Sequence, residues 1–325
     1  MSYRAISENL MALGARSALL AALVIVFSTF ALTAPSFLTT GNLQSLLVNN
    51  FTLLAVVAVA MTFAVASGGI DLSVGAAIDF ASFAFVSLVL AGNPVWLALF
   101  AGLGAGALVG LFNALLISGV GLSPFLATLG TLFVGRSIQQ LLTNGGNPIY
   151  LPQSGIPESF RALGHSTIVG IPLSLLAALA LAAVAAFLLG QTRFGRVVIA
   201  SGVQPDVVRY SGLPLRLYLG GAYILVGLTA AFAGLILTST VTVYIPNSGN
   251  AFLLNAIGAA FIGTTIHPHG RPNVFGTILG VLLLAIVSNG LLLSGLNFYW
   301  QQVGTGVLIF LVLALSFATR KTQRG

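Results

Sequence analysis

Long apolar runs, separated by short polar breaks, occupy most of this chain and restrict what it can fold into. Of its 325 residues, 58% are hydrophobic and only 5% are charged. A water-soluble domain carries roughly 25% charged residues, so this chain cannot surround a core with a hydrated surface. Apolar runs of about 20 residues match the length of a helix that crosses the hydrocarbon core of a bilayer. The sequence therefore predicts an all-α, polytopic helical bundle, with one transmembrane domain over residues 1–325.

Breaks rich in Gly, Pro and Asn divide the chain into about ten expected membrane helices, some of them broken. The first apolar run is long enough to span a membrane, which favours a membrane helix over a cleaved signal peptide. Pro124 suits the first turn of the helix that it opens. The helix limits near 51–75 and 252–272 are the least sharply marked. The expected helices cover residues 17–34, 51–66, 74–90, 95–120, 124–142, 171–189, 218–238, 253–266, 273–293 and 302–317.

The basic residues predict the orientation of this bundle. The net charge is +7, and the basic residues cluster between apolar runs, as the positive-inside rule requires, so nucleic-acid binding is disfavoured. With ten crossings and a cytoplasmic N-terminus, ten of the twelve basic residues fall on the cytoplasmic side. Arg161 alone lies in an outer loop, and Arg136 lies within a helix. Both termini are therefore expected in the cytoplasm.

The longest polar segment on the expected cytoplasmic side is 190–217. It holds a single acid, Asp206, and four arginines. A charged and partly helical loop of this length exceeds what a connection between two membrane helices needs. We therefore expect a docking surface for a separate motor protein. The arginines are Arg193, Arg196, Arg209 and Arg216.

The stretch SGGIDLSVG, residues 67–75, interrupts the apolar pattern with two glycines followed by an acid. Asp71 is placed to cap the next helix, where its charge meets the positive helix end. Broken helices beside apolar runs often mark translocation pathways. A capped structural turn and a pathway element are equally consistent with this stretch, and both can hold.

Asp79 lies inside an expected helix, where a carboxylate must face a cavity or a partner. Arg136 is the one cation that another helix offers, so the sequence predicts an ion pair. Reversing both charges should then rescue what either reversal breaks. The alternative is a protonated Asp79 that hydrogen-bonds a neighbouring hydroxyl or amide.

Further polar residues in or beside the apolar runs either join helices by hydrogen bonds or line a path for a neutral, hydroxyl-rich solute. They are Asn113, Thr128, Thr131, Gln139, Asn144, Asn255, Asn289 and Gln302. The full set of expected pathway residues is Ser67, Gly68, Gly69, Asp71, Ser73, Asp79, Thr128, Arg136, Asn255 and Asn289. Small residues at a spacing of four, such as Gly102, Gly106 and Gly110, predict close helix packing.

Four stretches together resemble the membrane subunit of ribose-type ABC importers, in the family's order and over nearly the whole chain. The resemblance implies a ten-helix permease that works as a dimer, either of two copies or with a paralogue, in the bacterial cytoplasmic (inner) membrane. It also implies two ATPase subunits, a periplasmic or lipid-anchored sugar-binding protein, and a monosaccharide or related polyol as solute. The stretches are SGGIDLSVG (67–75), PFLATLGTLFVGRSIQQLLTNG (124–145), FGRxxxAxG followed by SG (194–212), and LNAIGAAFIGTT with GRPNVFGTILG (254–280).

In that family the loop between the sixth and seventh helices carries a coupling helix. Carried over by position, Gly195, Arg196, Ala200 and Gly202 match its start, Ser211 and Gly212 match its end, and Asp206 and Arg209 lie between them. The chain departs from the pattern at Gln204-Pro205-Asp206, where Gly-Asn is usual, and at IGTTIHPHGRPN (262–273), where a glycine-rich run is usual. These departures bear on the substrate and on the ATPase partner.

The outer loop over 143–170 is expected to contact the binding protein through Glu158 and Arg161. His267 and His269 flank Pro268 and are more typical of a polar turn than of a metal site. The chain contains no cysteine, which excludes disulfides and thiol chemistry. No metal site is therefore expected.

The chain has no sequence that could hold ATP. A P-loop requires GxxxxGK[ST], and the one lysine, Lys321, follows Ala-Thr-Arg without a glycine loop. We therefore expect a transport subunit without catalytic residues or a cofactor, with ATP and Mg²⁺ bound by a partner. An ion-driven secondary transporter is the alternative, but it needs titratable groups at membrane depth, and Asp79 alone fits poorly. An intramembrane enzyme is disfavoured because no paired carboxylates, HExxH or serine–histidine arrangement occurs.

Overall fold

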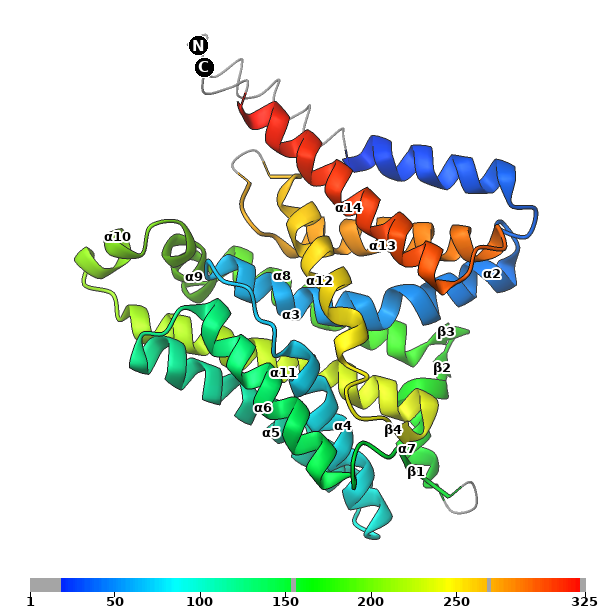
Figure 1. Ribbon diagram of the computed structural model, residues 1–325, viewed down its shortest axis with the longest axis horizontal. Coiled ribbons are helices and arrows are strands. Elements are labelled where there is room, and N and C mark those ends of the chain that lie inside the picture. The colour runs from blue at the N-terminus through cyan, green and yellow to red at the C-terminus, as the bar shows by residue number, and fades with distance from the viewer. Residues whose placement is uncertain (1–18, 153–155, 268–269, 322–325) are drawn as a thin grey trace.

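The computed structural model describes residues 19–152, 156–267 and 270–321, and helices dominate these ranges (Figure 1). Within them, five helices are long and apolar enough to cross a membrane, and three shorter apolar helices accompany them. The expectation of a helical membrane protein is confirmed. The five helices are Thr40–Ala66, Val95–Val120, Leu173–Gln191, Leu215–Val241 and Val274–Leu293, and the shorter ones are Leu19–Thr33, Val74–Leu90 and Asn250–Thr264.

The elements follow one another in an almost unbroken series of helices, with π-helical turns marked η. The first helix covers residues 19–33. The others are α2 (Thr40–Ser45), η1 (Leu46–Thr52), α3 (Leu53–Ala66), α4 (Val74–Leu90), α5 (Val95–Ala114), η2 (Leu115–Val120), α6 (Pro124–Leu142), α7 (Glu158–His165), α8 (Leu173–Gln191), α9 (Arg193–Val203), α10 (Pro205–Tyr210), α11 (Leu215–Val241), α12 (Asn250–Thr264), α13 (Val274–Leu293) and α14 (Phe298–Lys321).

Most helix limits agree with the sequence prediction, and α4 and α6 have the predicted bounds. One limit differs clearly, because the helix expected to start at residue 51 is helical from Thr40 onward. One polar residue of this extension, Asn42, has its partner within the bundle. Asn42 and Asn289 of α13 exchange two amide hydrogen bonds of 3.0 and 2.9 Å. The pair binds the start of the helix to α13.

Helix α3 forms the centre of the bundle. Its residues from Leu54 to Ala64 are all buried, and a helix that is apolar all round is one that neighbours surround. Helices α8, α11, α12 and α13 pack against it. The short break after α3 is therefore held deep inside the protein.

The glycine stripe of α5 permits the close helix packing that the sequence predicts. Gly102, Gly106 and Gly110 are buried against α4 and α11. A methyl group added at Gly106 would lie 2.7 Å from the carbonyl oxygen of Gly227 in α11. Backbones at this distance leave no room for a side chain, so α4, α5 and α11 form one tightly packed unit.

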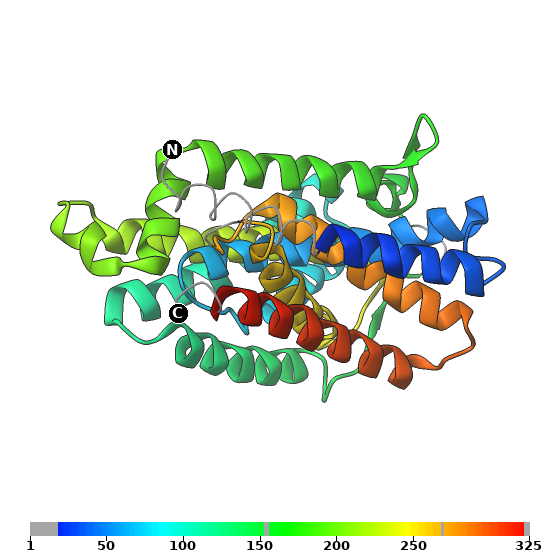
Figure 2. The same cartoon turned by 90° about the horizontal axis from the view of Figure 1, so that it is seen from above.

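The two ends of the bundle carry different structures. Helices α9 and α10 lie at one end, and α7 lies at the other end beside two small β ladders (Figures 1 and 2). One ladder pairs β1 (Ile149–Tyr150) with β4 (Val243–Tyr244), and the other pairs β2 (Thr167–Ile168) with β3 (Ile171–Pro172), both antiparallel.

Candidate functional site

The break between α3 and α4, residues 67–73, is a compact turn. The amide of Gly69 donates to the carbonyl oxygen of Ala64 at 3.0 Å, and Gly68 has a φ of +87°, a left-handed conformation that suits glycine. Helix α3 therefore stops at the glycines because the backbone turns there in a way that other residues resist.

Buried hydrogen bonds tie the break to α5 and α6. The Asp71 carboxylate is buried and accepts from the amide of Ser73 at 2.7 Å and from its hydroxyl at 2.6 Å. The Asn113 amide of α5 donates to the Ser73 hydroxyl oxygen at 2.6 Å, and the Thr131 hydroxyl of α6 donates to Asn113 at 2.6 Å. We call Asp71, Ser73, Asn113 and Thr131 the inner network.

Asp71 is not the N-cap residue of α4, as the sequence predicted, but binds the residue that is. Ser73 is the N-cap residue of α4, and its side chain makes no capping bond to the helix. Asp71 instead fixes the cap residue itself. The sequence prediction placed the carboxylate at the right helix end, but the N-cap residue is Ser73 and not Asp71.

Two further contacts enclose the break. Thr128 of α6 donates to the carbonyl oxygen of Ile70 at 3.3 Å. A methyl group at Gly69 would collide with the Tyr223 hydroxyl of α11 and lie 2.6 Å from the Cβ atom of Pro124. The break is thus held between α6 and α11 as well as α5.

A second buried cluster lies around Asp79, whose side chain has 0% exposure. One carboxylate oxygen accepts from the amide of Gly249 at 2.8 Å and from the hydroxyl of Ser248 at 3.1 Å. Both donors belong to residues 245–249, the linker between β4 and α12. Asp79 therefore fastens this linker to α4.

Gln139 of α6 holds the same part of the chain. Its carbonyl oxygen accepts from the amide of Asn247 at 2.8 Å and from the hydroxyl of Tyr244 at 3.3 Å. Burial raises the pKa of Tyr244, and the charge of Asp79 adds to the effect, so the hydroxyl stays protonated as a donor. We call Asp79, Gln139, Tyr244, Ser248 and Gly249 the linker clamp.

The predicted ion pair between Asp79 and Arg136 is wrong. Arg136 lies on the exposed side of α6, whereas Asp79 is fully buried in α4. Asp79 accepts from a hydroxyl and an amide instead, which are the partner types that the alternative interpretation named. The rescue by double charge reversal is accordingly no longer expected.

The other expected pathway residues do not gather at one place. Asn289 is engaged with Asn42 between α13 and α2, and Asn255 lies half-buried on α12. Ser67 bonds its hydroxyl to the carbonyl oxygen of Ala64 and closes the end of α3. The structure brings Gly68, Gly69, Asp71, Ser73 and Thr128 together around the break.

The arginine segment is largely helical. Thr192 caps α9 by accepting from the Gly195 amide at 3.2 Å, and Gly195 lies where a side chain would meet the carbonyl oxygens of Leu188 and Leu189. Arg196 donates to the carbonyl oxygen of Gln191 at 3.1 Å. Glycine at 195 therefore lets α9 fold back sharply against the end of α8.

The outer side of α9 and α10 exposes both apolar and charged side chains. Val203, Val207 and Tyr210 are 66%, 56% and 88% exposed. Asp206 and Arg209 form an exposed ion pair at 3.8 Å, and such a pair adds little stability. We call Val203, Asp206, Val207, Arg209 and Tyr210 the α9–α10 surface. Apolar patches of this kind mark protein interaction sites.

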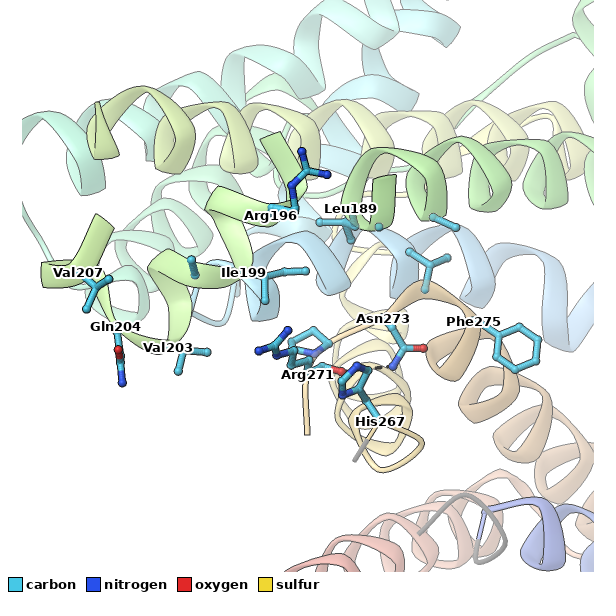
Figure 3. A pocket seen from close by; sticks show the side chains of 15 residues that line it. Leu189, Arg196, Ile199, Val203, Gln204, Val207, His267, Arg271, Asn273 and Phe275 are labelled. Atoms are coloured by element: carbon cyan, nitrogen blue, oxygen red, sulfur yellow. Dashed lines mark hydrogen bonds between the residues drawn. The ribbon is translucent and has the colours of Figure 1, made fainter. Parts of the chain in front are cut away.

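A cavity of about 940 Å³ separates α9 from the chain before and at the start of α13 (Figure 3). Ile199, Ala200 and Val203 form the α9 wall, and Arg271 and Phe275 stand on the other wall. Ala200, expected in the coupling helix, is exposed to this space. His267 also lines the cavity, while His269 lies outside the described residues.

Ser211 and Gly212 end the arginine segment as the sequence predicts. The Ser211 amide donates to the carbonyl oxygen of Val207 at 3.0 Å, and Gly212 takes a φ of +72°. At the opposite end of the protein, Glu158 is exposed in the first turn of α7, and Arg161 is half-buried in the same helix. Neither lies near the α9–α10 surface.

Sequence reasoning missed Tyr223, Tyr244, Ser248 and Gly249. Tyr223 and Tyr244 rank among the largest fully buried side chains, and a buried tyrosine hydroxyl normally requires a partner. Their position in or beside an apolar run was a signal that could have been followed. Ser248 and Gly249 donate to Asp79 only because the fold brings them close to it, and the sequence gives no signal of that.

The fold is that of a helical membrane protein, and its family follows from comparison with known proteins. A family described as "Branched-chain amino acid transport system / permease component" matches residues 42–313. The chain belongs to this family of permease components. The expected likeness to permeases of ribose-type ABC importers is confirmed by its relatives.

The relatives share about a third of their residues with this chain. The ribose import permease protein RbsC of Bacillus subtilis (strain 168) is 34% identical over 281 residues, 86% of either chain. The D-allose transport system permease protein AlsC of Escherichia coli (strain K12) is 31% identical over 90% of this chain and 89% of its own. The L-arabinose ABC transporter permease protein AraH of Azospirillum brasilense is 31% identical over 95% of this chain and 89% of its own. No solved structure matches the chain.

Proposed function

We propose that this chain forms the translocation pathway of an ATP-driven importer and that residues 190–217 couple it to separate ATPase subunits. ATP and Mg²⁺ are then bound by the ATPase, and this chain contributes no cofactor site. The transport component of such an importer moves its solute only when a partner subunit supplies energy. The alternative, an ion-driven transporter, is disfavoured by the family to which the chain belongs.

The exposed α9–α10 surface carries this proposal. Large apolar side chains that stand 56–88% exposed beside arginines are costly on a free surface and suit a protein partner. The segment lies at one end of the bundle, away from α7 (Figure 1). A partner docked there would reach α9 directly, and Arg196 and Arg209 would lie at or near the contact, whereas Gly202 faces the break between α3 and α4.

The number of membrane crossings and the side on which each terminus lies belong to the same proposal. Ten crossings with both termini in the cytoplasm place the α9–α10 surface in the cytoplasm, where ATP is available. The end with α7 then faces the outside, where Glu158 and Arg161 would contact a periplasmic or lipid-anchored binding protein. A second permease, either an identical copy or a paralogue, would complete the pathway in the bacterial inner membrane.

The solute is proposed to be a monosaccharide or a related polyol. The names of the relatives specify ribose, D-allose and L-arabinose, and similar permeases support a similar solute class. Uptake of these three labelled sugars by cells that express the complete importer tests the class. Accumulation of a charged amino acid with no accumulation of any sugar would contradict it.

An engineered cysteine tests the coupling surface. The natural chain has no cysteine, so Asp206→Cys introduces a single thiol. In the assembled complex we expect this thiol to cross-link to an ATPase subunit and to lose reactivity toward a soluble maleimide. The matched variant is Glu158→Cys, on the α7 end, which should stay reactive and form no such cross-link when permease and ATPase are assembled without the binding protein. If the thiol of Asp206→Cys reacted equally fast in the free permease and in the complex, the coupling role would be refuted.

A further inference from the structure

Helix α9 touches the break between α3 and α4 through bare backbone. A methyl group added at Gly202 would collide with the carbonyl oxygen of Ala66 and lie 2.7 Å from the amide nitrogen of Gly68. In the other direction, a methyl group at Gly68 would lie 2.8 Å from the Cα atom of Gly202. Two glycines thus bring the segments closer than side chains permit, and the contact has no flexible side chain to absorb a displacement.

The opposite face of α9 borders open space, into which the helix can shift. Gly195, Val197, Val198 and Ser201 form its buried side, whereas Ile199, Ala200 and Val203 border the cavity of about 940 Å³ (Figure 3). Packed interiors resist displacement because they contain few voids. A shift of α9 into the cavity meets no such resistance, and it would pull directly on the Gly202–Gly68 contact.

The break passes such a displacement to three other helices. Gly68 lies three residues before Asp71, and the inner network continues from Asp71 through Ser73 and Asn113 to Thr131 with bonds of 2.6–2.7 Å. Asp71 and Ser73 belong to the break, which leads directly into α4, and Asn113 and Thr131 belong to α5 and α6. Coupling can travel through contiguous contacts between elements, and here the steps are a backbone contact, the short chain from Gly68 to Asp71, and buried hydrogen bonds.

We propose that the contact between Gly202 and Gly68 is the joint through which movement of α9 reaches the pathway, with the inner network as its continuation. The inference rests on the proposed function, because it assumes that an ATPase acts on α9. It assigns Gly202, Gly68 and Asn113 a role in transport that is separate from binding the ATPase. Substitutions at these positions should uncouple ATP hydrolysis from uptake.

Gly202→Ala tests the joint in the complete importer with its ATPase and binding protein. Alanine favours helix more than glycine does, so α9 itself should not be weakened. The added methyl group must push α9 away from the break. We expect uptake to fall at least about tenfold, within the 5–150-fold range of typical coupling, while ATP hydrolysis and ATPase binding are retained. Gly104→Ala on α5, where a methyl group meets nothing within 4 Å, should leave both unchanged.

Asn113→Ala tests the continuation without touching α9. It removes both the bond that Asn113 donates to Ser73 and the bond that it accepts from Thr131, and we expect the same pattern of retained hydrolysis and lost uptake. Normal uptake by Gly202→Ala or Asn113→Ala would overturn the inference, and so would loss of ATPase binding by Gly202→Ala. By contrast, an Asp206→Cys thiol that stays fully accessible in the complex would overturn the proposed function itself.

A reversible cross-link provides a test that does not depend on a tolerated core substitution. Cysteines in place of Ala200 and Phe275, which are exposed on the two walls of the cavity, can be bridged with reducible bifunctional reagents of increasing length. A bridge that holds α9 in place should stop uptake while hydrolysis continues, and reduction should restore uptake. Undiminished uptake in the bridged importer would contradict the need for α9 to move.

Discussion

Asp71→Ala is expected to destabilise the permease and abolish uptake. The substitution leaves the amide and hydroxyl of Ser73 without their buried acceptor. Each unsatisfied buried donor costs about 1–3 kcal/mol, so we expect a loss of about 3 kcal/mol or more in the free energy of unfolding. Denaturant unfolding in detergent, followed by uptake in reconstituted vesicles, measures the two effects.

Asp71→Asn provides the matched comparison. The amide oxygen can still accept from Ser73, so most of the stability should remain, and the loss relative to the parent should be much smaller than for alanine. Equal stability of Asp71→Ala and the parent would show that the inner network does not hold the break. The account of how α4, α5 and α6 are joined would then fail.

Asp79→Ala is expected to release the linker between β4 and α12. Its carboxylate holds the amide of Gly249 and the hydroxyl of Ser248, and both would be left without that acceptor. Each unsatisfied buried donor costs about 1–3 kcal/mol, so we expect a loss of about 2–6 kcal/mol in the free energy of unfolding. Hydrogen exchange of the Gly249 amide should also rise, because this donor no longer has its partner.

Arg136→Gln is the control for Asp79. Arg136 is exposed on α6 and makes no contact with the carboxylate, so its neutralisation should leave the unfolding free energy within about 0.5 kcal/mol of the parent. If Arg136→Gln destabilised the protein as much as Asp79→Ala, the linker clamp described here would be wrong and the ion pair would return as the explanation.

The sequence predicts the helices because the length of an apolar run and the residues that end it are local properties. Val74–Leu90 and Pro124–Leu142 follow from flanking glycine and proline residues. The start at Thr40 could not be predicted in the same way, because Asn42 is acceptable inside the bundle only through its partner Asn289, which lies 247 positions away. A polar residue whose partner is distant in sequence resembles an interfacial one until the fold is known.

The candidate site shows the same division. The glycines, Asp71 and the arginine segment stand out locally, and the structure places the first two in one turn. The pairing of Asp79 failed because the rotation of α6 about its axis decides whether Arg136 points inward, and composition does not specify that rotation. The contact between Gly202 and Gly68 could not be predicted, since it depends on how α9 folds back against α8.

The dependence on an external ATPase is tested most directly by uptake into sealed vesicles. The purified permease alone should produce no accumulation of the labelled sugar inside the vesicles, with or without an ion gradient. Adding the ATPase subunits, ATP and the loaded binding protein should produce accumulation against the gradient. Uphill accumulation by the permease alone would contradict the account, because the chain would then have its own source of energy.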